Sequence, residues 1–344
     1  MSAPNSDALL TLSQLRGLAS PDEQPREAAR ERALERLGRI PHYAQLTRLD
    51  LARPTINFHP DRPGPGGRSV IEGLWADGVY RNQFEVRITN GDPTAFPGGK
   101  RHRRESEMFG GWYDDTPASD RPKYGSLDLF HGPLGGWPRF GSSYLVLVPA
   151  VLDRSTFLVG GGLSRRSWVG TRSALEELLA DARPSVCAEP RRSWRSDGWV
   201  EMHVHGPVRL AHDVLMLVMD DSFQDTPAGD IAIRVAERYG VEFEWAPGLR
   251  SDTRTWRVPA DRCAPRALVA AAVFRDRICS AYEIGRVLYT CFERTREIVP
   301  MDAATRDGVA KYFWNRMLLS DDVSARWVGP LAGREAGPAG RTTG

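Results

Sequence analysis

Apolar and polar positions follow two different periods along this chain, and the change of period divides it into parts. Between about residues 54 and 210, short apolar runs alternate with connections rich in Gly and Pro, a pattern typical of strands joined by turns. After His212 the apolar positions recur at helical spacing. We therefore expect an α+β fold, in which a sheet-containing core is followed by a mainly helical part.

The pattern predicts the following elements. The strands expected in the first part are Thr55–His59, Tyr124–Leu129, Ser143–Pro149, Thr156–Val159 and Val200–His205. The helices expected there are Ser69–Trp75, Arg101–Phe109 and Ser173–Leu179. The helices expected in the second part are Asp213–Asp220, Asp230–Tyr239, Arg266–Ile278, Ala281–Arg296 and Asp302–Leu318. A small strand pair, Val241–Trp245 with Thr255–Val258, is expected among them.

The two ends of the chain are expected to lie outside the core. Ser20–Glu23 combines an N-cap serine, a proline at the first helical position and a capping-box glutamate, so we expect a helix that ends at Gly38. Its high charge predicts a peripheral position. The tail from Gly329 has the composition of a disordered segment. The expected division is a helical arm at 1–45, an α+β core at 46–220, a mainly helical part at 221–328 and a disordered tail at 329–344.

Charge and composition exclude several classes of protein. Lys and Arg together number 46 against 44 Asp and Glu, so the net charge of +2 provides no bulk field for nucleic acid or an anionic membrane. No apolar run approaches the roughly 20 residues of a membrane span. The amino terminus lacks the pattern of a secretory signal, and the four cysteines form no Cys-x-x-Cys pair. We expect a cytoplasmic protein with reduced thiols and no membrane partner.

The segment Trp199–Gly206 carries an unusual row of polar side chains. On a strand, Val200, Met202 and Val204 point to one face, so Glu201, His203 and His205 point together to the other. This row has two interpretations besides an enzymatic carboxylate. It is either an ordinary solvent-exposed face or a metal site in which His203 and His205 are ligands.

A second polar row precedes the end of the first expected strand. In Thr55–Asp61, Ile56 and Phe58 share the apolar face, and His59 belongs to the opposite face. Pro60 has no N–H to donate and therefore ends regular pairing. His59 is thus expected at a strand end, either in a site or bonded to a neighbouring carbonyl.

A third segment, Arg121–Leu129, places Tyr124 at the start of a strand. Gly125 has no side chain and would let a ligand or a backbone approach Tyr124 closely. A similar aromatic-Gly-Ser sequence occurs at Phe140–Ser142, and packing aromatics would explain both. The basic run Arg101–Arg104 is followed by acidic residues, so we interpret it as a solvated helix face.

Together these segments resemble a bacterial family, domain of unknown function 3626. The stretches that carry the resemblance span about residues 50 to 260 and are Ile56–Arg62, Tyr80–Asn90, Phe109–Asp115, Arg121–Leu129, Pro138–Ser142, Ser155–Phe157 and Val200–Val208. The order His, Tyr and Glu on successive strand edges also resembles the signature of the ADP-ribosyltransferase superfamily.

The second resemblance implies a split mixed sheet and NAD as substrate. In that superfamily the histidine orders NAD, the tyrosine stacks on nicotinamide and the glutamate drives the chemistry, roles that fall here on His59, Tyr124 and Glu201. Ser126 and Gly125 would lie near the nicotinamide. A fixed carboxylate stabilises the oxocarbenium-like cation formed when the nicotinamide–ribose bond breaks. Trp199 stands where arginine-directed members carry a second Glu or Gln, so arginine is not favoured as acceptor.

The expected function is accordingly an NAD-dependent ADP-ribosyltransferase or NAD glycohydrolase that holds no metal. Its acceptor stays open between protein, nucleic acid and water. Two other classes compete with it. One is a metal-dependent, β-rich enzyme in which His203 and His205 are joined by His59 or Glu201. The other is a non-catalytic binding module on the same scaffold.

Overall fold

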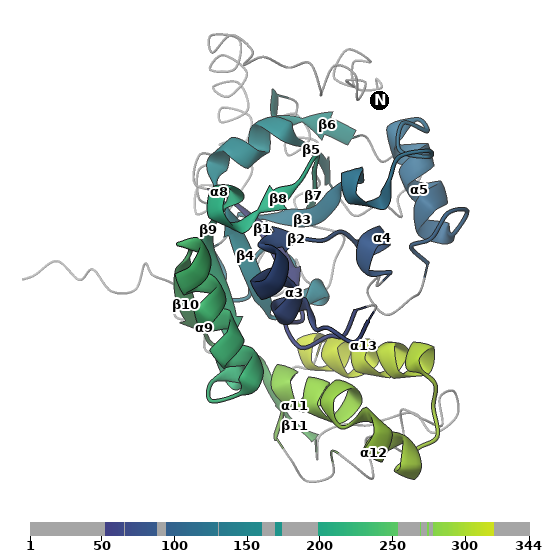
Figure 1. The fold of residues 1–344 in the computed structure, drawn as a ribbon, viewed down its shortest axis with the longest axis vertical. Coiled ribbons are helices and arrows are strands. Elements are labelled where there is room, and N and C mark those ends of the chain that lie inside the picture. Colours follow the sequence, from purple (N-terminus) through teal and green to yellow (C-terminus); the bar gives the residue numbers. More distant parts are fainter. Residues whose placement is uncertain are drawn as a thin grey trace, which may run out of the picture.

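A large mixed sheet runs through the part of the chain that the computed structural model describes, which comprises residues 52–64, 66–87, 94–129, 131–159, 169–173, 199–253, 269, 274 and 278–319. Its eight described strands lie in the order β10-β9-β4-β1-β3-β7-β5-β6 (Figure 1). They are β1 (Arg53–Phe58), β3 (Lys123–Asp128), β4 (Ser143–Leu147), β5 (Ser155–Val159), β6 (Val169–Thr171), β7 (Val200–Val204), β9 (Val214–Asp220) and β10 (Glu242–Ala246). β10 pairs with β9 in parallel and the other neighbours pair antiparallel.

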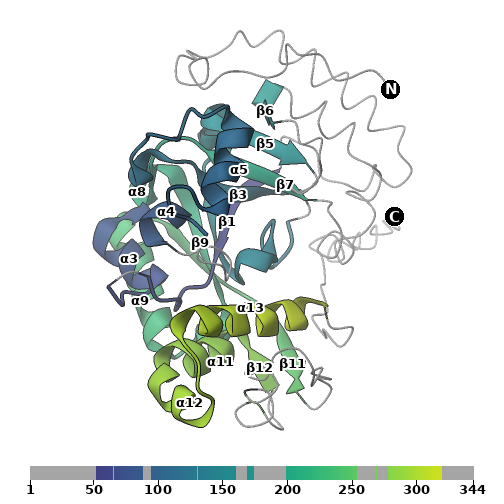
Figure 2. The same ribbon diagram turned by 90° about the vertical axis from the view of Figure 1, so that its right-hand side faces the viewer.

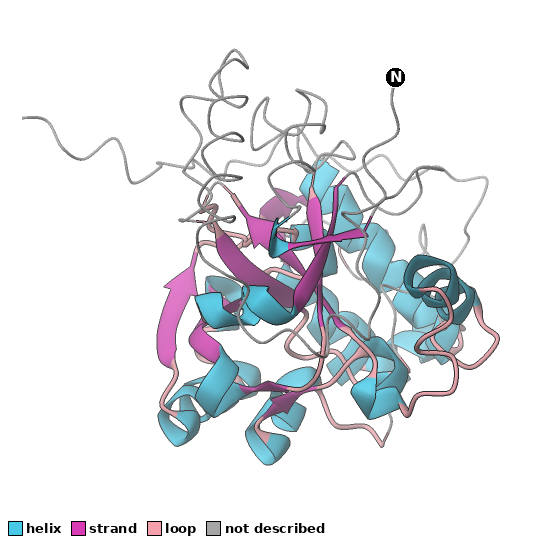
Figure 3. Ribbon diagram, turned by 90° about the horizontal axis from the view of Figure 1, so that it is seen from above, coloured by secondary structure: helices cyan, strands magenta, loops and turns pink. Residues whose placement is uncertain are grey.

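Helices and two small sheets complete the mixed α+β fold. The helices lie around the main sheet on several sides (Figure 3). The helices are α3 (Val70–Asp77), α4 (Gln83–Val86), α5 (Lys100–Phe109), α8 (Leu210–Asp213), α9 (Pro227–Tyr239), α11 (Ala281–Gly285), α12 (Phe292–Ile298) and α13 (Ala303–Leu319). A π-helical stretch, Arg286–Thr290, joins α11 to α12. The small sheets pair β2 (Val79–Tyr80) with β8 (Val208–Arg209) and β11 (Arg250–Asp252) with β12 (Ile278–Ser280).

Helix boundaries follow local capping chemistry. Ser69 begins α3 with a reciprocal capping box to Glu72, and Gly78 ends it at φ 64°, a conformation that glycine adopts without strain. Thr226 caps α9 in front of a proline at the first helical position. None of the helices in the described ranges is long and apolar enough to cross a bilayer.

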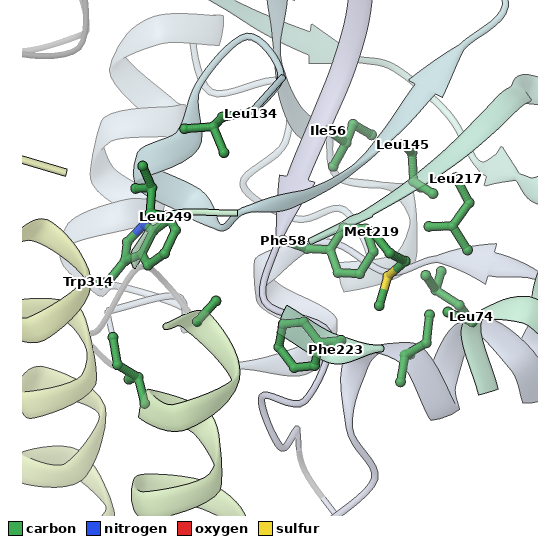
Figure 4. Packing of buried hydrophobic residues seen from close by; sticks show 14 of the residues in the cluster. Ile56, Phe58, Leu74, Leu134, Leu145, Leu217, Met219, Phe223, Leu249 and Trp314 are labelled. Atoms are coloured by element: carbon green, nitrogen blue, oxygen red, sulfur yellow. The ribbon is translucent and has the colours of Figure 1, made fainter. Parts of the chain in front are cut away.

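The main core lies on one face of the sheet. Ile56, Phe58 and Leu217 project from that face toward Leu74 of α3 (Figure 4). Val235 of α9 belongs to the same buried cluster. Helices α11, α12 and α13 lie together beyond one end of the sheet (Figure 2), and Trp314 Nε1 of α13 donates to the Pro138 carbonyl at 2.7 Å.

The sheet separates into two halves between β1 and β3. These strands pair only from Arg53↔Asp128 to Thr55↔Ser126. Beyond Thr55, β1 pairs with β4 alone, and β3 before Ser126 pairs with β7 alone. The opening between the halves is therefore bordered by the end of β1 and the start of β3.

Two expectations about elements are wrong. Asp213–Asp220 was expected to be helical, but Val214–Asp220 is strand β9, and the flanking strands β4 and β10 satisfy its backbone on both sides. The expected strand Val241–Trp245 corresponds to β10, which joins the main sheet beside β9, and its expected partner Thr255–Val258 lies outside the described residues. The large sheet therefore extends beyond residue 220. Ala281–Arg296, expected as one helix, consists of α11, the π-helical stretch and α12.

Other expected segments lie outside the described residues. They are the arm at 1–45, the tail at 329–344, the strand at 255–258 and nearly all of the helices at 173–179 and 266–278.

Candidate functional site

A cleft of about 670 Å³ opens where the two halves of the sheet separate. Asn57, Phe58 and His59 at the end of β1 line one side, and Tyr124 of β3 and Glu201 of β7 line the other. Residues of α3, α4 and α5 complete the wall. The prediction that His59, Tyr124 and Glu201 share one cleft is confirmed, although 65 and 77 positions separate them in sequence.

Two side chains contact the Glu201 carboxylate through their N–H groups. Only 3% of the residue is exposed. His203 Nε2 donates to its Oε1 at 3.0 Å, and Arg104 Nη2 lies 3.3 Å from Oε1 and 3.2 Å from Oε2. Burial alone would raise the pKa of Glu201, but the His203 hydrogen bond and the charges of Arg104 and Arg101 hold it below its ordinary value. The carboxylate is therefore ionised near neutral pH.

Tyr124 is held by contacts to its hydroxyl and to its ring. Its hydroxyl donates to Glu105 Oε1 at 2.9 Å. The Arg101 guanidinium lies over the ring, 5.4 Å from the centroid, and the His203 ring meets it edge-on at 5.1 Å. Burial and the neighbouring Glu105 raise the pKa of Tyr124 well above its ordinary value, so the phenol stays protonated.

Glu105 is a second buried carboxylate behind the cleft. It is 0% exposed and accepts a 2.8 Å bond from Arg121 Nη1, besides the bond from Tyr124. Burial raises the pKa of Glu105 against the opposing effect of these two partners. This ion pair ties α5 to the segment that enters β3, and thereby positions Arg101 and Arg104 over the cleft.

His59 follows the last residue of β1. Its ring packs edge-on against Trp314 of α13, with 5.3 Å between centroids. Burial, together with the charge of Arg62, lowers the pKa of His59 to about 3. His59 is therefore a neutral imidazole at physiological pH, able to donate one hydrogen bond and accept another.

The wall of the cleft is rich in positive charge. Its described cationic residues are Arg62, Arg68, Arg81, Arg101, Arg104, Arg139 and Lys311, against the carboxylates of Asp77, Glu85 and Glu201. The interpretation of Arg101–Arg104 as a solvated helix face is therefore corrected in part. Arg101 and Arg104, one helical turn apart, face the cleft, whereas Arg103 is exposed.

Three aromatic side chains share the cleft with Glu201. Trp199 stacks on Trp137 with centroids 4.3 Å apart and planes inclined by 14°. Phe140 meets Trp199 edge-on at 5.9 Å, and all three line the cleft. Trp199 is two positions before Glu201, so it enters the same cleft from the same edge of β7.

His203 and His205 lie on the face of Glu201, as predicted, and Val200, Met202 and Val204 belong to the core on the other face. The polar face is buried rather than solvent-exposed, since His203 is 0% exposed. All four ring nitrogens of the two histidines lie within 3.2 Å of a protein hydrogen-bond partner. Among the described residues, no three His, Cys, Asp or Glu side chains are grouped to hold a metal.

Ser126 and Gly125, expected beside a nicotinamide, do not line the cleft. Ser126 Oγ lies 3.2 Å from Thr55 Oγ1, and the backbone at Gly136 covers it so closely that a Cβ there would come within 2.6 Å. A Cβ on Gly125 would meet the Thr55 carbonyl oxygen at 2.5 Å. The reason is strand pairing, because Ser126 lies where β1 and β3 are still joined, whereas Tyr124 lies beyond their separation.

Sequence reasoning missed Arg104, Glu105 and Trp137 and gave Trp199 no position in the cleft. A partial signal existed for Arg101 and Arg104, whose spacing of three residues places both on one helix face. No local signal indicates that this face meets Glu201, 97 residues later.

Comparison with protein families finds a match over most of the chain. A family model described as protein of unknown function (DUF3626) matches residues 53–189 and 186–314. The matched residues include His59, Tyr124 and Glu201. A search of curated proteins found no match.

Proposed function

We propose that this chain, which belongs to the family described as protein of unknown function (DUF3626), is an NAD-dependent ADP-ribosyltransferase or NAD glycohydrolase. The observation that carries the proposal is the convergence of His59, Tyr124 and Glu201 on one cleft. They follow or belong to the adjacent strands β1, β3 and β7, and β1 and β3 part beside them. A split mixed sheet with this trio at its opening is the arrangement that the ADP-ribosyltransferase resemblance implies.

Glu201 supplies the electrostatic requirement of nicotinamide–ribose cleavage. Positive charge develops on the ribose as the bond breaks, and an ionised carboxylate beside it favours the transition state over the bound substrate. Glu201 is buried, ionised and oriented by Arg104 and His203 before any ligand arrives. The Glu201 carboxylate and its two partners therefore need to move little during the reaction.

The rest of the cleft suits the other parts of NAD. The pyrophosphate carries two negative charges, which the surplus of arginines in the wall would neutralise. A nicotinamide stacked on Tyr124 would displace Arg101 from the ring and release it toward the pyrophosphate. His59, kept neutral, would orient the substrate through hydrogen bonds rather than charge.

Strand order favours Tyr124 over Phe140 as the stacking residue. Tyr124 lies on β3, between the strand that precedes His59 and the strand that carries Glu201. Phe140 comes just before β4, on the far side of β1. Both rings line the cleft, but Tyr124 belongs to the strand that pairs directly with β7, the strand of Glu201.

The test is NAD consumption by purified wild-type protein and by Glu201→Gln, with water and candidate protein and nucleic-acid acceptors supplied. The amide keeps the shape of the carboxylate and can still hydrogen-bond a ribose hydroxyl but lacks the negative charge, so NAD affinity should persist while turnover falls by about 100-fold or more. Glu237→Gln, an exposed position on α9, is the matched control and should retain full turnover.

Two results would count against the proposal. Wild-type protein that neither binds nor consumes NAD would favour a binding module. Unchanged turnover in Glu201→Gln would remove this carboxylate from the centre of the chemistry.

A further inference from the structure

We propose that His203 is a positioning residue for Glu201, and that Thr156, His205 and Tyr113 fix it as a neutral hydrogen-bond donor through one continuous chain of hydrogen bonds. The inference deepens the proposed function, because it explains how the acting carboxylate is held. It also stands on contacts that exist without any ligand.

The chain of contacts links five side chains from three parts of the fold. Glu201 Oε1 and His203 Nε2 are 3.0 Å apart on β7. Thr156, directly opposite His203 on β5, places its Oγ1 3.2 Å from His203 Nδ1 and 3.0 Å from His205 Nε2. His205 Nδ1 is 2.6 Å from the hydroxyl of Tyr113, which lies in the turn after α5.

Given the neutral His203 ring of the proposal, the protons available set the direction of each bond. Ionised Glu201 can only accept, so His203 Nε2 must donate and, in the neutral ring, Nδ1 must accept. Thr156 has one hydroxyl proton, and that proton goes to His203 Nδ1. The contact between Thr156 and His205 then requires His205 Nε2 to donate. His205 Nδ1 is left as the acceptor of the Tyr113 hydroxyl.

Because His203 is buried, the loss of one of its hydrogen-bond partners should change its tautomer. His203 is 0%, Tyr113 2% and Thr156 3% exposed, whereas His205 is partly exposed, so solvent does not replace a partner lost by His203. The Phe109 ring covers the chain and meets His203, His205 and Tyr113 edge-on at 5.3–5.7 Å. A hydroxyl removed at Thr156 would leave His203 Nδ1 without its donor and free the ring to adopt the other tautomer.

The two oxygens of Glu201 consequently have different roles. His203 anchors Oε1, which Arg104 also contacts, whereas Oε2 contacts Arg104 but not His203 and is the oxygen left to receive a ribose hydroxyl. The charged and titratable groups that face Glu201 are His203 on its own strand, Arg101 and Arg104 on α5, and Tyr124 on β3 with Glu105 behind it. Loss of the His203 donor would therefore shift the pH at which Glu201 ionises while leaving the arginines in place.

The first experiment needs no activity. Nitrogen-15 spectra of labelled histidines near neutral pH, assigned with His203→Gln, should show His203 and His205 as neutral rings protonated at Nε2. Thr156→Val should move the Nδ1 resonance of His203, whereas Thr295→Val, which removes an equally buried threonine hydroxyl from α12, should not. A ring protonated at Nδ1 alone, or a charged His203, would overturn the assignment.

The second experiment measures NAD turnover against pH. His203→Gln keeps a neutral donor at the position of Nε2, so its kcat should stay within about threefold of wild type. His203→Leu should lose about 100-fold in kcat with little change in KM, and its acid limb should move to higher pH because unassisted Glu201 binds protons more readily. Thr156→Val and Tyr113→Phe should lose kcat by about 10-fold, whereas Thr295→Val should not.

The outcomes separate this inference from the proposed function. Absence of NAD turnover in wild type would refute the function, and the nitrogen-15 spectra would still decide whether the chain exists. Turnover that His203→Leu and Thr156→Val leave unchanged would refute the positioning role while the NAD chemistry stands. If His203→Leu fails to fold, Thr156→Val and Tyr113→Phe decide between these results.

Discussion

Arg104 Nη2 lies 3.2 Å from Glu201 Oε2, although 97 residues separate the two in the chain. The contact brings α5 over the edge of β7 and, together with the His203 hydrogen bond, offsets the burial that alone would raise the pKa of Glu201. With the Glu105–Arg121 pair one position further along α5, it fixes this helix as the wall of the cleft.

Arg104→Met should destabilise the fold more than the same change one residue earlier. Removal of the guanidinium leaves Glu201 with less compensation, and because the Arg104 side chain is 27% exposed we expect a loss of about 1–2 kcal/mol in the free energy of unfolding. Arg103→Met, at an exposed position, should change it by less than about 0.5 kcal/mol. Urea unfolding of both variants measures the difference, and equal values would mean that the ion pair contributes nothing measurable.

Tyr124 has two separable contributions, its ring and its hydroxyl. Tyr124→Phe keeps the ring but leaves Glu105 without one donor, so we expect lower thermal stability with NAD affinity within about threefold of wild type. Tyr124→Ala removes the stacking surface and should weaken NAD binding by about 10-fold or more. Calorimetric titration and thermal melts test the pair, and an unchanged affinity in Tyr124→Ala would shift the stacking role to Phe140.

The Glu105–Arg121 pair should show the cost of an uncompensated buried charge. Both side chains are at most 4% exposed, so Arg121→Met should lower the free energy of unfolding by about 3–5 kcal/mol. The double variant Arg121→Met with Glu105→Gln removes both charges and should be more stable than Arg121→Met alone. Chemical denaturation measures this cycle. A double variant that is less stable than Arg121→Met would show that Glu105 stabilises the fold without its partner.

We expect the buried carboxyl group of Asp61 to make the free energy of unfolding depend on pH. Burial, reinforced by the charge of Asp220, raises the pKa of Asp61 to about 7, and its Oδ2 has no hydrogen-bond partner. A folded-state pKa above the unfolded value means that protonated Asp61 favours the fold. This contribution is complete below about pH 4 and is lost as the pH rises to about 7.

Asp61→Asn isolates that contribution. The amide does not titrate, so the fall in unfolding free energy between pH 4 and 7 should be smaller in the variant by on the order of 2–4 kcal/mol. Denaturant unfolding of wild type and variant across this range gives the difference. Parallel curves would show that Asp61 titrates alike in both states.

Much of the site could be read from local patterns. The alternation of Val200–Val204 already determines that Glu201 and His203 share a face, because successive side chains on a strand point in opposite directions. His59 and Tyr124 were found from strand ends and from the family resemblance, and both line the cleft. The helical spacing of apolar positions likewise predicted the helices α3 and α9 to within a few residues.

The remainder depended on partners distant in sequence. The apolar run Val214–Asp220 suits a buried helix or a buried strand equally, and only the flanking strands β4 and β10 decide for a strand. Ser126 has the right neighbours for a cleft residue, but its pairing with Thr55 encloses it in the sheet.

Sequence by itself therefore determined the faces of the strands and the positions of several helices, since these depend on neighbours within a few residues, and the resemblance supplied the choice of His59, Tyr124 and Glu201. Tertiary structure alone decided that a basic helix face meets a carboxylate rather than water, and that two histidines are bound into a chain of hydrogen bonds behind it. The physical reason is that desolvation and hydrogen-bond pairing depend on which elements pack together. Local periodicity does not contain that information.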